Sequence, residues 1–92
     1  MLDIVSSNRF KKDLKQIIKR GYNIELLNQV VNRLASNKPL DEKYKDHPLI
    51  GNYAGFRECH ITPDWLLIYQ IQENELILFL SRTGTHSDLF NS

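Results

Sequence analysis

The chain has 92 residues, of which 41% are hydrophobic and 25% charged, with a formal net charge of +1 and a single cysteine, Cys59. This length and composition indicate one globular domain spanning residues 1–92 and argue against a disordered chain. A lone cysteine excludes an internal disulfide, so we expect a reducing, cytoplasmic setting.

The first residues predict a short strand followed by a helix. Residues 2–5 form the candidate strand, and Ser6 or Ser7 can accept the free amide hydrogens at the start of the helix. Gly21 suits the C-terminal cap of this helix. Apolar residues recur at helical spacing on one face, at Phe10, Leu14, Ile17 and Ile18.

A second helix is predicted to begin near the capping residue Asn23 and to end before residues 37–39. Its apolar stripe is broader, so we expect it to be more buried than the first helix; the stripe comprises Leu26, Leu27, Val30, Val31, Leu34 and Ala35. The short connection between the two helices predicts an antiparallel hairpin.

Positive charge is concentrated in this helical half. Residues 1–45 carry ten Lys or Arg against five Asp or Glu, a balance of +5, whereas residues 46–92 carry two against six, a balance of −4. Such asymmetry is typical of a protein with one basic binding surface. The solvated faces of ordinary helices give the same pattern, so both interpretations stand at this point.

Residues 40–52 show no sustained period and include Pro48 and Gly51, which predicts a surface loop. His47 stands immediately before Pro48 and is therefore expected to be extended, with its side chain projecting from the loop. Loops held by a rigid scaffold often carry site residues.

Three strands are predicted next, at residues 56–61, 65–71 and 76–82, joined by turns at 62–64 and 72–75. Alternation places Phe56, Glu58 and His60 on one face of the first strand and Cys59 on the other, where it is expected to be a buried small hydrophobe. We predict an α+β fold, in which the N-terminal strand is an added edge and the two-helix hairpin packs on one face of an antiparallel meander. The longest uninterrupted apolar run, Trp65 to Tyr69, is too short to cross a bilayer, and the N-terminus lacks the pattern of a signal peptide.

The segment Arg82 to Phe90 follows the last predicted strand, and Gly84 lets the chain turn sharply there. An arginine, a histidine and an aromatic ring would then lie close together, which suits chemistry on an anion. Alternatively, Thr85 or Ser87 caps a short terminal helix, His86 is an ordinary surface imidazole and Phe90 fills the core.

The three histidines, His47, His60 and His86, fall near strand ends that can meet at one end of the sheet, with Glu58 and Asp64 beside them. RNA cleavage needs a general base for the ribose 2′-hydroxyl, a general acid for the departing 5′-oxygen and a cation for the extra phosphate charge. Histidine suits both proton roles.

Two further possibilities concern the surroundings of these histidines. The ring of Trp65 or Phe90 could stack on a splayed base, although a residue such as Trp65 is more often part of the core than a stacking platform. A His₃ zinc site is an alternative, but no pair has the close spacing of a helical metal motif. Acid/base catalysis needs no metal, so we expect no metal or other cofactor.

Four motifs occur in order in the second half of the chain. They are Lys45-Asp46-His47-Pro48-Leu49, Gly55-Phe56-Arg57-Glu58-Cys59-His60, Pro63-Asp64-Trp65-Leu66-Leu67-Ile68-Tyr69 and Arg82-Thr83-Gly84-Thr85-His86-Ser87-Asp88-Leu89-Phe90. With them the chain closely resembles the YafQ branch of the RelE/ParE toxin superfamily. The resemblance implies a RelE-like fold and the toxin of a toxin–antitoxin pair, a metal-independent endoribonuclease that cuts messenger RNA in the ribosomal A site.

The resemblance also implies site residues. Active-site status carries over to His47, His60, Asp64, His86 and Phe90, and further to Trp65 and Arg82. Where family members can have an aspartate, this chain has Glu58, which keeps the carboxylate but shifts it by a methylene. We expect His86 to lead proton transfer with His60, Asp64 and Glu58, His47 to position phosphate or share in proton transfer, and Arg82 to stabilise charge.

The implied partners are a cognate antitoxin, the ribosome and messenger RNA. The basic first helix would dock on 16S ribosomal RNA, with Lys11, Lys12 and Lys15 as the main contacts among its cations, which also include Arg9, Lys19 and Arg20. Two rivals remain open here: a ParE-like toxin that inhibits DNA gyrase by binding, and an inactive relic that only binds the antitoxin.

Overall fold

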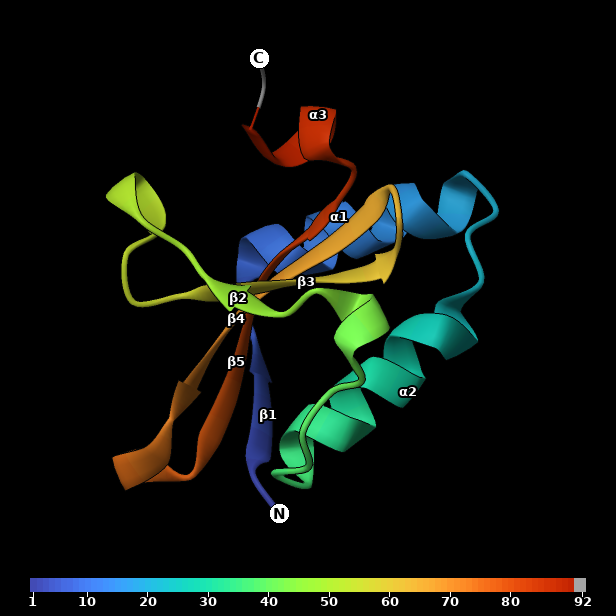
Figure 1. Ribbon diagram of the computed structural model, residues 1–92. Helices are drawn as coiled ribbons and strands as arrows, with labels where there is room; N and C mark the ends of the chain where they lie inside the picture. Colours follow the sequence, from blue (N-terminus) through green and yellow to red (C-terminus); the bar gives the residue numbers. More distant parts are fainter. Residues whose placement is uncertain (91–92) are drawn as a thin grey trace.

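The computed structural model describes residues 1–90, which form three α-helices and one five-stranded sheet with the strand order β1-β5-β4-β3-β2 (Figure 1). The strands are β1 (Asp3–Ser6), β2 (His47–Pro48), β3 (Arg57–Thr62), β4 (Trp65–Gln72) and β5 (Ile77–Gly84). The α-helices are α1 (Asn8–Lys19), α2 (Ile24–Ala35) and α3 (His86–Phe90), and short 3-10 turns are η1 (Glu42–Tyr44), η2 (Gly51–Tyr53) and η3 (Glu73–Glu75). The predicted α+β class is confirmed.

Both predicted helix starts carry the expected caps. The hydroxyl oxygen of Ser7 accepts a hydrogen bond from the amide of Phe10 at 2.9 Å, and the side chain of Asn23 accepts one from the amide of Glu25 at 3.1 Å. Ser7 also donates to the carbonyl of Ser81 at 2.7 Å, which ties the start of α1 to β5. Figure 1 shows the chain reversing direction between α1 and α2, as predicted.

The two helices pack on one face of the sheet. Their buried residues join one core with alternate residues of the central strands, including Cys59, Trp65, Leu67 and Tyr69. Burying each large aliphatic side chain in such a core contributes about 1.5–3 kcal/mol. As predicted, α2 is more buried than α1, but the assignment of Ile18 to the buried stripe is wrong, because Ile17 occupies the position against the sheet and Ile18 is 55% exposed.

The strands form an antiparallel meander with one parallel addition. β1 pairs parallel with β5 and is the predicted extra edge. The loop predicted for residues 40–52 is wrong in one respect: its residues His47 and Pro48 form β2, which pairs antiparallel with β3. Pro48 is tolerated there because β2 is an edge strand and needs no further amide donor.

Alternation along β4 separates the two faces of the sheet as predicted. Leu66 and Ile68 lie opposite the helix side and pack with Leu89 of α3, against which Phe56 and Phe90 also pack. The last strand begins at Ile77 rather than at Leu76, because Leu76 adopts a left-handed turn conformation with φ of 56°.

A break in register between β4 and β5 decides which way the end of β5 faces. Tyr69 pairs with Leu80, but Ile68 pairs with Arg82, so Ser81 is an extra residue. Strict alternation from Leu80 would have placed Arg82 on the helix side. The bulge instead places Arg82 on the side of Ile68. No helix within residues 1–90 has the length and apolar content needed to cross a membrane.

Candidate active site

One row of residues crosses the sheet on the face opposite α1 and α2. His47 pairs with Glu58, Glu58 pairs with Ile68, and Ile68 pairs with Arg82. Side chains of directly opposed residues in antiparallel strands lie on the same face. The row therefore brings a histidine, a carboxylate and an arginine, drawn from three strands, onto one surface.

The next row carries the second histidine and leads to the third. His60 pairs with Leu66, and Leu66 pairs with Gly84, after which α3 begins at His86. Gly84 has a φ of +156°, and a Cβ atom there would lie 3.0 Å from the Cβ of Asp88, so the tight turn into α3 requires glycine. His86 thus leaves the sheet two strands away from His60, roughly 10 Å in strand spacing.

His47 and His60 converge on Glu58. The Nε2 atom of His47 lies 3.5 Å from Oε1 of Glu58, and the Nε2 atom of His60 lies 3.6 Å from the same oxygen. Their ring centroids are 6.5 Å apart. The predicted convergence is therefore observed for these two histidines, with Glu58 between them.

Backbone carbonyls orient both imidazoles. Nδ1 of His47 lies 2.7 Å from the carbonyl oxygen of Lys45, and Nδ1 of His60 lies 3.4 Å from that of Pro63. A carbonyl only accepts, so each Nδ1 carries a proton and each Nε2 is directed at Glu58. At 3.5 and 3.6 Å the Nε2 atoms contact Oε1 without a hydrogen bond, and a small shift of the side chains would bring them within the reach that proton transfer requires.

The carboxylate lies beneath the imidazoles. The side chain of Glu58 is 7% exposed, whereas those of His47 and His60 are 47% and 26% exposed. A buried carboxylate is costly unless it is paired. Within the part of the chain that the structure describes, the side chains in ion-pair range of Glu58 are these two histidines, so Glu58 links them to each other.

α3 carries the predicted third histidine and the aromatic ring. His86 is exposed, and its ring centroid lies 4.8 Å from that of Phe90. Phe90 also makes an edge contact with Tyr53, at 6.0 Å between centroids, and is partly buried. Phe90 therefore packs against the sheet while retaining some exposed surface beside His86.

Arg82 is held firmly at the end of its row. Its Nε donates to Oδ2 of Asp13 at 2.8 Å, and its Nη2 donates to Oδ1 at 3.0 Å. The hydrogen bond with Asp13 raises the pKa of Arg82, so the guanidinium stays charged. Asp13 therefore contacts the guanidinium through two of its three nitrogens, Nε and Nη2.

Two predicted residues lie elsewhere. Trp65 is fully buried on the helix side, donates to Thr83 at 2.8 Å and packs edge-on against Tyr22, so the prediction that Trp65 contacts substrate is wrong. Asp64 is exposed in the turn before β4 and accepts from Thr62 at 3.0 Å. No hydrogen bond or ion pair joins Asp64 to a histidine within residues 1–90.

The basic residues predicted to bind nucleic acid, Lys11, Lys12 and Lys15, are all exposed on α1. They stand outside the two rows just described.

Sequence reasoning missed Asp13 and Tyr53. Asp13 holds both Arg82 and the amide of Thr83, the latter at 3.2 Å. A signal was available, since Asp13 is the only acidic residue of the basic helix α1. Tyr53 had no comparable signal, because it lies in a segment without periodicity.

The remaining groups with chemical potential lie outside these two rows. Burial raises the pKa of Cys59 to about 12, so its thiol is not a nucleophile at neutral pH. No group of three or more His, Cys, Asp or Glu side chains among residues 1–90 is arranged to hold a metal ion.

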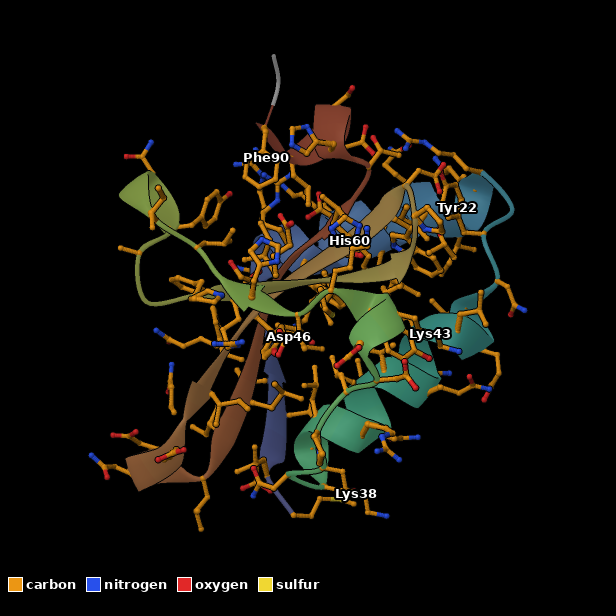
Figure 2. The ribbon with its side chains drawn as sticks, viewed as in Figure 1. Tyr22, Lys38, Lys43, Asp46, His60 and Phe90 are labelled. Atoms are coloured by element: carbon orange, nitrogen blue, oxygen red, sulfur yellow. The ribbon has the colours of Figure 1, made fainter. Side chains whose placement is uncertain are left out.

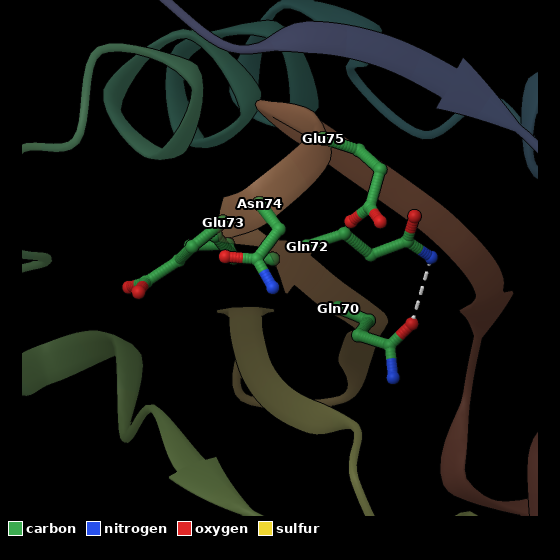
Figure 3. A pocket seen from close by; sticks show the side chains of 6 residues that line it. Gln70, Gln72, Glu73, Asn74 and Glu75 are labelled. Atoms are coloured by element: carbon green, nitrogen blue, oxygen red, sulfur yellow. Dashed lines mark hydrogen bonds between the residues drawn. The ribbon is translucent and has the colours of Figure 1, made fainter.

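A shallow hollow of about 610 Å³ is lined by residues 70–75 at the β4–β5 turn, where Gln72 donates to Gln70 at 2.9 Å (Figure 3). It lies at the opposite end of β5 from α3, roughly 25 Å away along the strand.

Comparisons with known proteins identify relatives that match almost the whole chain. Residues 2–91 match the family model described as "Bacterial toxin of type II toxin-antitoxin system, YafQ". The mRNA interferase toxin YafQ of Escherichia coli strain K12 is 42% identical over 89 residues, covering 96% of this chain and 95% of that protein. The putative toxin YafQ of Haemophilus influenzae is 37% identical over 91 residues, covering 94% of this chain and 89% of that protein.

Solved structures of related toxins share the fold of this chain along nearly its whole length. A metal-bound toxin from Helicobacter pylori is 54% identical, with a TM-score of 0.92 over 98% of this chain and all of that one. YafQ in the E. coli DinJ–YafQ complex is 41% identical, with a TM-score of 0.89 over 98% of this chain and 99% of that one.

Proposed function

The chain belongs to the YafQ family of bacterial toxins of type II toxin–antitoxin systems, and we propose that it is an mRNA interferase that cuts messenger RNA in the ribosomal A site without a metal ion. The proposal is supported by the relatives that carry this name and by the acid/base groups gathered on one face of the sheet. The single observation that carries it is the position of Glu58, whose Oε1 faces the Nε2 atoms of both His47 and His60.

The reaction requires one proton to be removed and one to be delivered. The ribose 2′-hydroxyl loses its proton as its oxygen attacks the adjacent phosphorus, and the bond to the 5′-oxygen of the next nucleotide breaks. The products are a cyclic phosphate and a 5′-hydroxyl. We assign proton removal to the Glu58 group with His47 and His60, and proton delivery to the 5′-oxygen to His86, which is exposed on α3.

The developing negative charge on phosphorus needs a fixed cation. Arg82 shares a row with Glu58, and Asp13 holds its guanidinium in one orientation through Nε and Nη2. A preorganised donor of this kind stabilises charge better than a mobile one, because it need not reorient during the reaction. Phe90, with Tyr53 behind it, offers an aromatic surface on which a base can stack beside His86.

Two macromolecular partners follow from this function. The exposed cations Lys11, Lys12 and Lys15 on α1 would contact phosphates of 16S ribosomal RNA and place the toxin over the messenger. Since YafQ of E. coli has been crystallised with DinJ, we propose that a cognate antitoxin binds and neutralises this chain.

The alternative of a ParE-like gyrase inhibitor is not favoured, since the relatives at 42% identity are named mRNA interferase toxins. Expression of the chain without an antitoxin, followed by mapping of the 5′ ends of messenger fragments, tests the choice. Cuts locked to the reading frame are expected for a ribosome-dependent nuclease. Inhibition of gyrase supercoiling by purified protein, without messenger cleavage, would instead establish the binding toxin, and absence of both would leave only antitoxin binding.

A further inference from the structure

A hollow of about 470 Å³ adjoins His60 at the outer edge of β3. β2 pairs with Arg57 and Glu58 of β3, and no strand formed by residues 1–90 covers the edge of β3 beyond them. α2 and η1 border the hollow there instead, and Figure 2 shows Lys43 of η1 on the same side of the molecule as His60. The hollow therefore opens directly beside a proposed catalytic group.

The lining combines apolar residues, called the floor below, with polar residues, called the rim. Leu26, Ile61 and Pro63 supply the floor. The rim consists of Gln29, Lys43, Tyr44 and Lys45. The volume lies in the range of small-ligand sites, and an apolar floor with a few polar groups is what such ligands require. A flat nucleobase fits this combination better than a bare phosphate would.

The rim also carries positive charge. Lys43 and Lys45 are exposed, and the ammonium of Lys43 lies 5.2 Å from the centroid of the Tyr44 ring. No ion pair neutralises either lysine within residues 1–90. Two unpaired cations beside an aromatic ring form an arrangement that binds a nucleotide by its phosphate and its base together.

Lys45 connects this rim to the catalytic group. It adopts a left-handed backbone with φ of 51°, a conformation that non-glycine residues seldom adopt. In this conformation its carbonyl oxygen lies 2.7 Å from Nδ1 of His47. His60 thus lines the hollow, and His47 is oriented by the rim residue Lys45.

We propose that this hollow is a nucleotide subsite, which binds the residue of the RNA that flanks the scissile phosphate on the side away from Phe90. The inference rests on the proposed function, since it assumes that RNA is cut at the Glu58 group. The base lies on the apolar floor against Tyr44, the side-chain amide of Gln29 reads its edge, and Lys43 and Lys45 contact the phosphates. This subsite contributes to the choice of cleavage sequence.

The test compares Lys43→Gln and Gln29→Ala with the wild type in cleavage of ribosome-bound messenger. Lys43→Gln is expected to raise KM roughly threefold to tenfold while kcat is retained. It should also make the slope of log K for binding against log salt concentration shallower by about 0.7, the change expected for one lost phosphate contact. Gln29→Ala is expected to weaken the base preference at one position next to the cut. Lys38→Gln is the matched control, because Lys38 is exposed but lies far from His60 (Figure 2).

A second measurement does not depend on cleavage. Titration with a 2′-O-methyl trinucleotide, which cannot be cut, should shift the NMR signals of the Gln29 amide and the Tyr44 ring as well as those of His60. Shifts confined to α3 and its neighbours would overturn the subsite.

The outcomes separate the two proposals. A wild-type chain that never cleaves messenger refutes the proposed function. A wild-type chain that cleaves, while Lys43→Gln and Gln29→Ala cleave with unchanged KM and unchanged base preference, refutes the subsite alone. If these substitutions weaken the antitoxin complex and leave cleavage unchanged, the hollow binds protein and the subsite is refuted.

Discussion

Arg20, the residue that caps the end of α1, binds Asp88 of α3 through two hydrogen bonds, Nη1 to Oδ2 at 2.6 Å and Nη2 to Oδ1 at 3.1 Å. Asp88 also accepts from the amide of Thr85 at 2.9 Å. A helix of five residues is unstable alone, so α3 depends on such contacts and on the burial of Leu89. The proposed general acid His86 is therefore positioned partly by a side chain 66 residues away in the sequence.

The first prediction concerns this ion pair. Arg20→Gln should lower kcat for messenger cleavage by roughly tenfold, because α3 loses its anchor and His86 its fixed position. Both side chains are partly exposed, at 42% and 31%, so the thermal midpoint of the whole protein should change little. Arg20→Lys keeps the charge but not the two-bond geometry and should give an intermediate kcat. Equal kcat values for Arg20→Gln and the wild type would exclude a positioning role.

The second prediction concerns pH. The hydrogen bond from Arg20 lowers the pKa of Asp88 from 3.8 to about 2. A depressed carboxyl pKa stabilises the folded state above the unfolded value, and this stabilisation is lost as the pH falls through the folded value. The NMR signals of His86 and Phe90 should therefore report docked α3 down to about pH 4 and undocking between about pH 4 and pH 2. In Asp88→Asn the same signals should lack this transition, and an unchanged transition there would assign it to another group.

The third prediction compares two carboxylates. Glu58→Gln preserves size but cannot exchange a proton with His47 or His60, so cleavage should fall by roughly a hundredfold or more. Asp64→Asn should cost less, since no hydrogen bond or ion pair within residues 1–90 links Asp64 to a histidine. Single-turnover cleavage of ribosome-bound messenger would measure both. A larger loss of activity for Asp64→Asn than for Glu58→Gln would assign the role of general base to Asp64 instead of Glu58.

The fourth prediction concerns His86. His86→Ala should lower the cleavage rate by roughly a hundredfold or more, if it protonates the 5′-oxygen. Because His86 is exposed, the substitution should leave the fold intact, as circular dichroism and thermal unfolding would show. Wild-type cleavage by folded His86→Ala would remove it from the mechanism.

The fifth prediction separates a core residue from a substrate contact. Trp65→Phe removes the hydrogen bond to Thr83 and leaves a gap in the core, which should destabilise the protein by about 1–3 kcal/mol. Cleavage per folded molecule should stay near the wild-type level, since the ring is 0% exposed. Chemical unfolding would measure the stability of Trp65→Phe, and cleavage assays at low temperature would measure its activity. Lost activity at unchanged stability would show that Trp65 contacts the substrate.

Local pattern alone was sufficient for the helices and the central strands. Ser7 and Asn23 cap their helices because the unpaired amides of a first turn need nearby acceptors, whatever the rest of the fold does. The two faces of β4 follow from a period of two, which is also a local property. The same alternation placed Glu58 and His60 on one face of β3 before any partner of that strand was known.

The composite site depended on tertiary structure. β2 has two residues and no periodicity, yet its register with β3 sets His47 against Glu58. The extra residue Ser81 places Arg82 on the same face of the sheet as Glu58, and no local sequence pattern predicts such a bulge. The pairs Asp13 with Arg82 and Arg20 with Asp88 join opposite ends of the chain. The sequence by itself therefore determined which residue types were present and which face of an element each occupied, whereas strand register and helix docking, which are settled only by packing of the whole core, decided which of them meet.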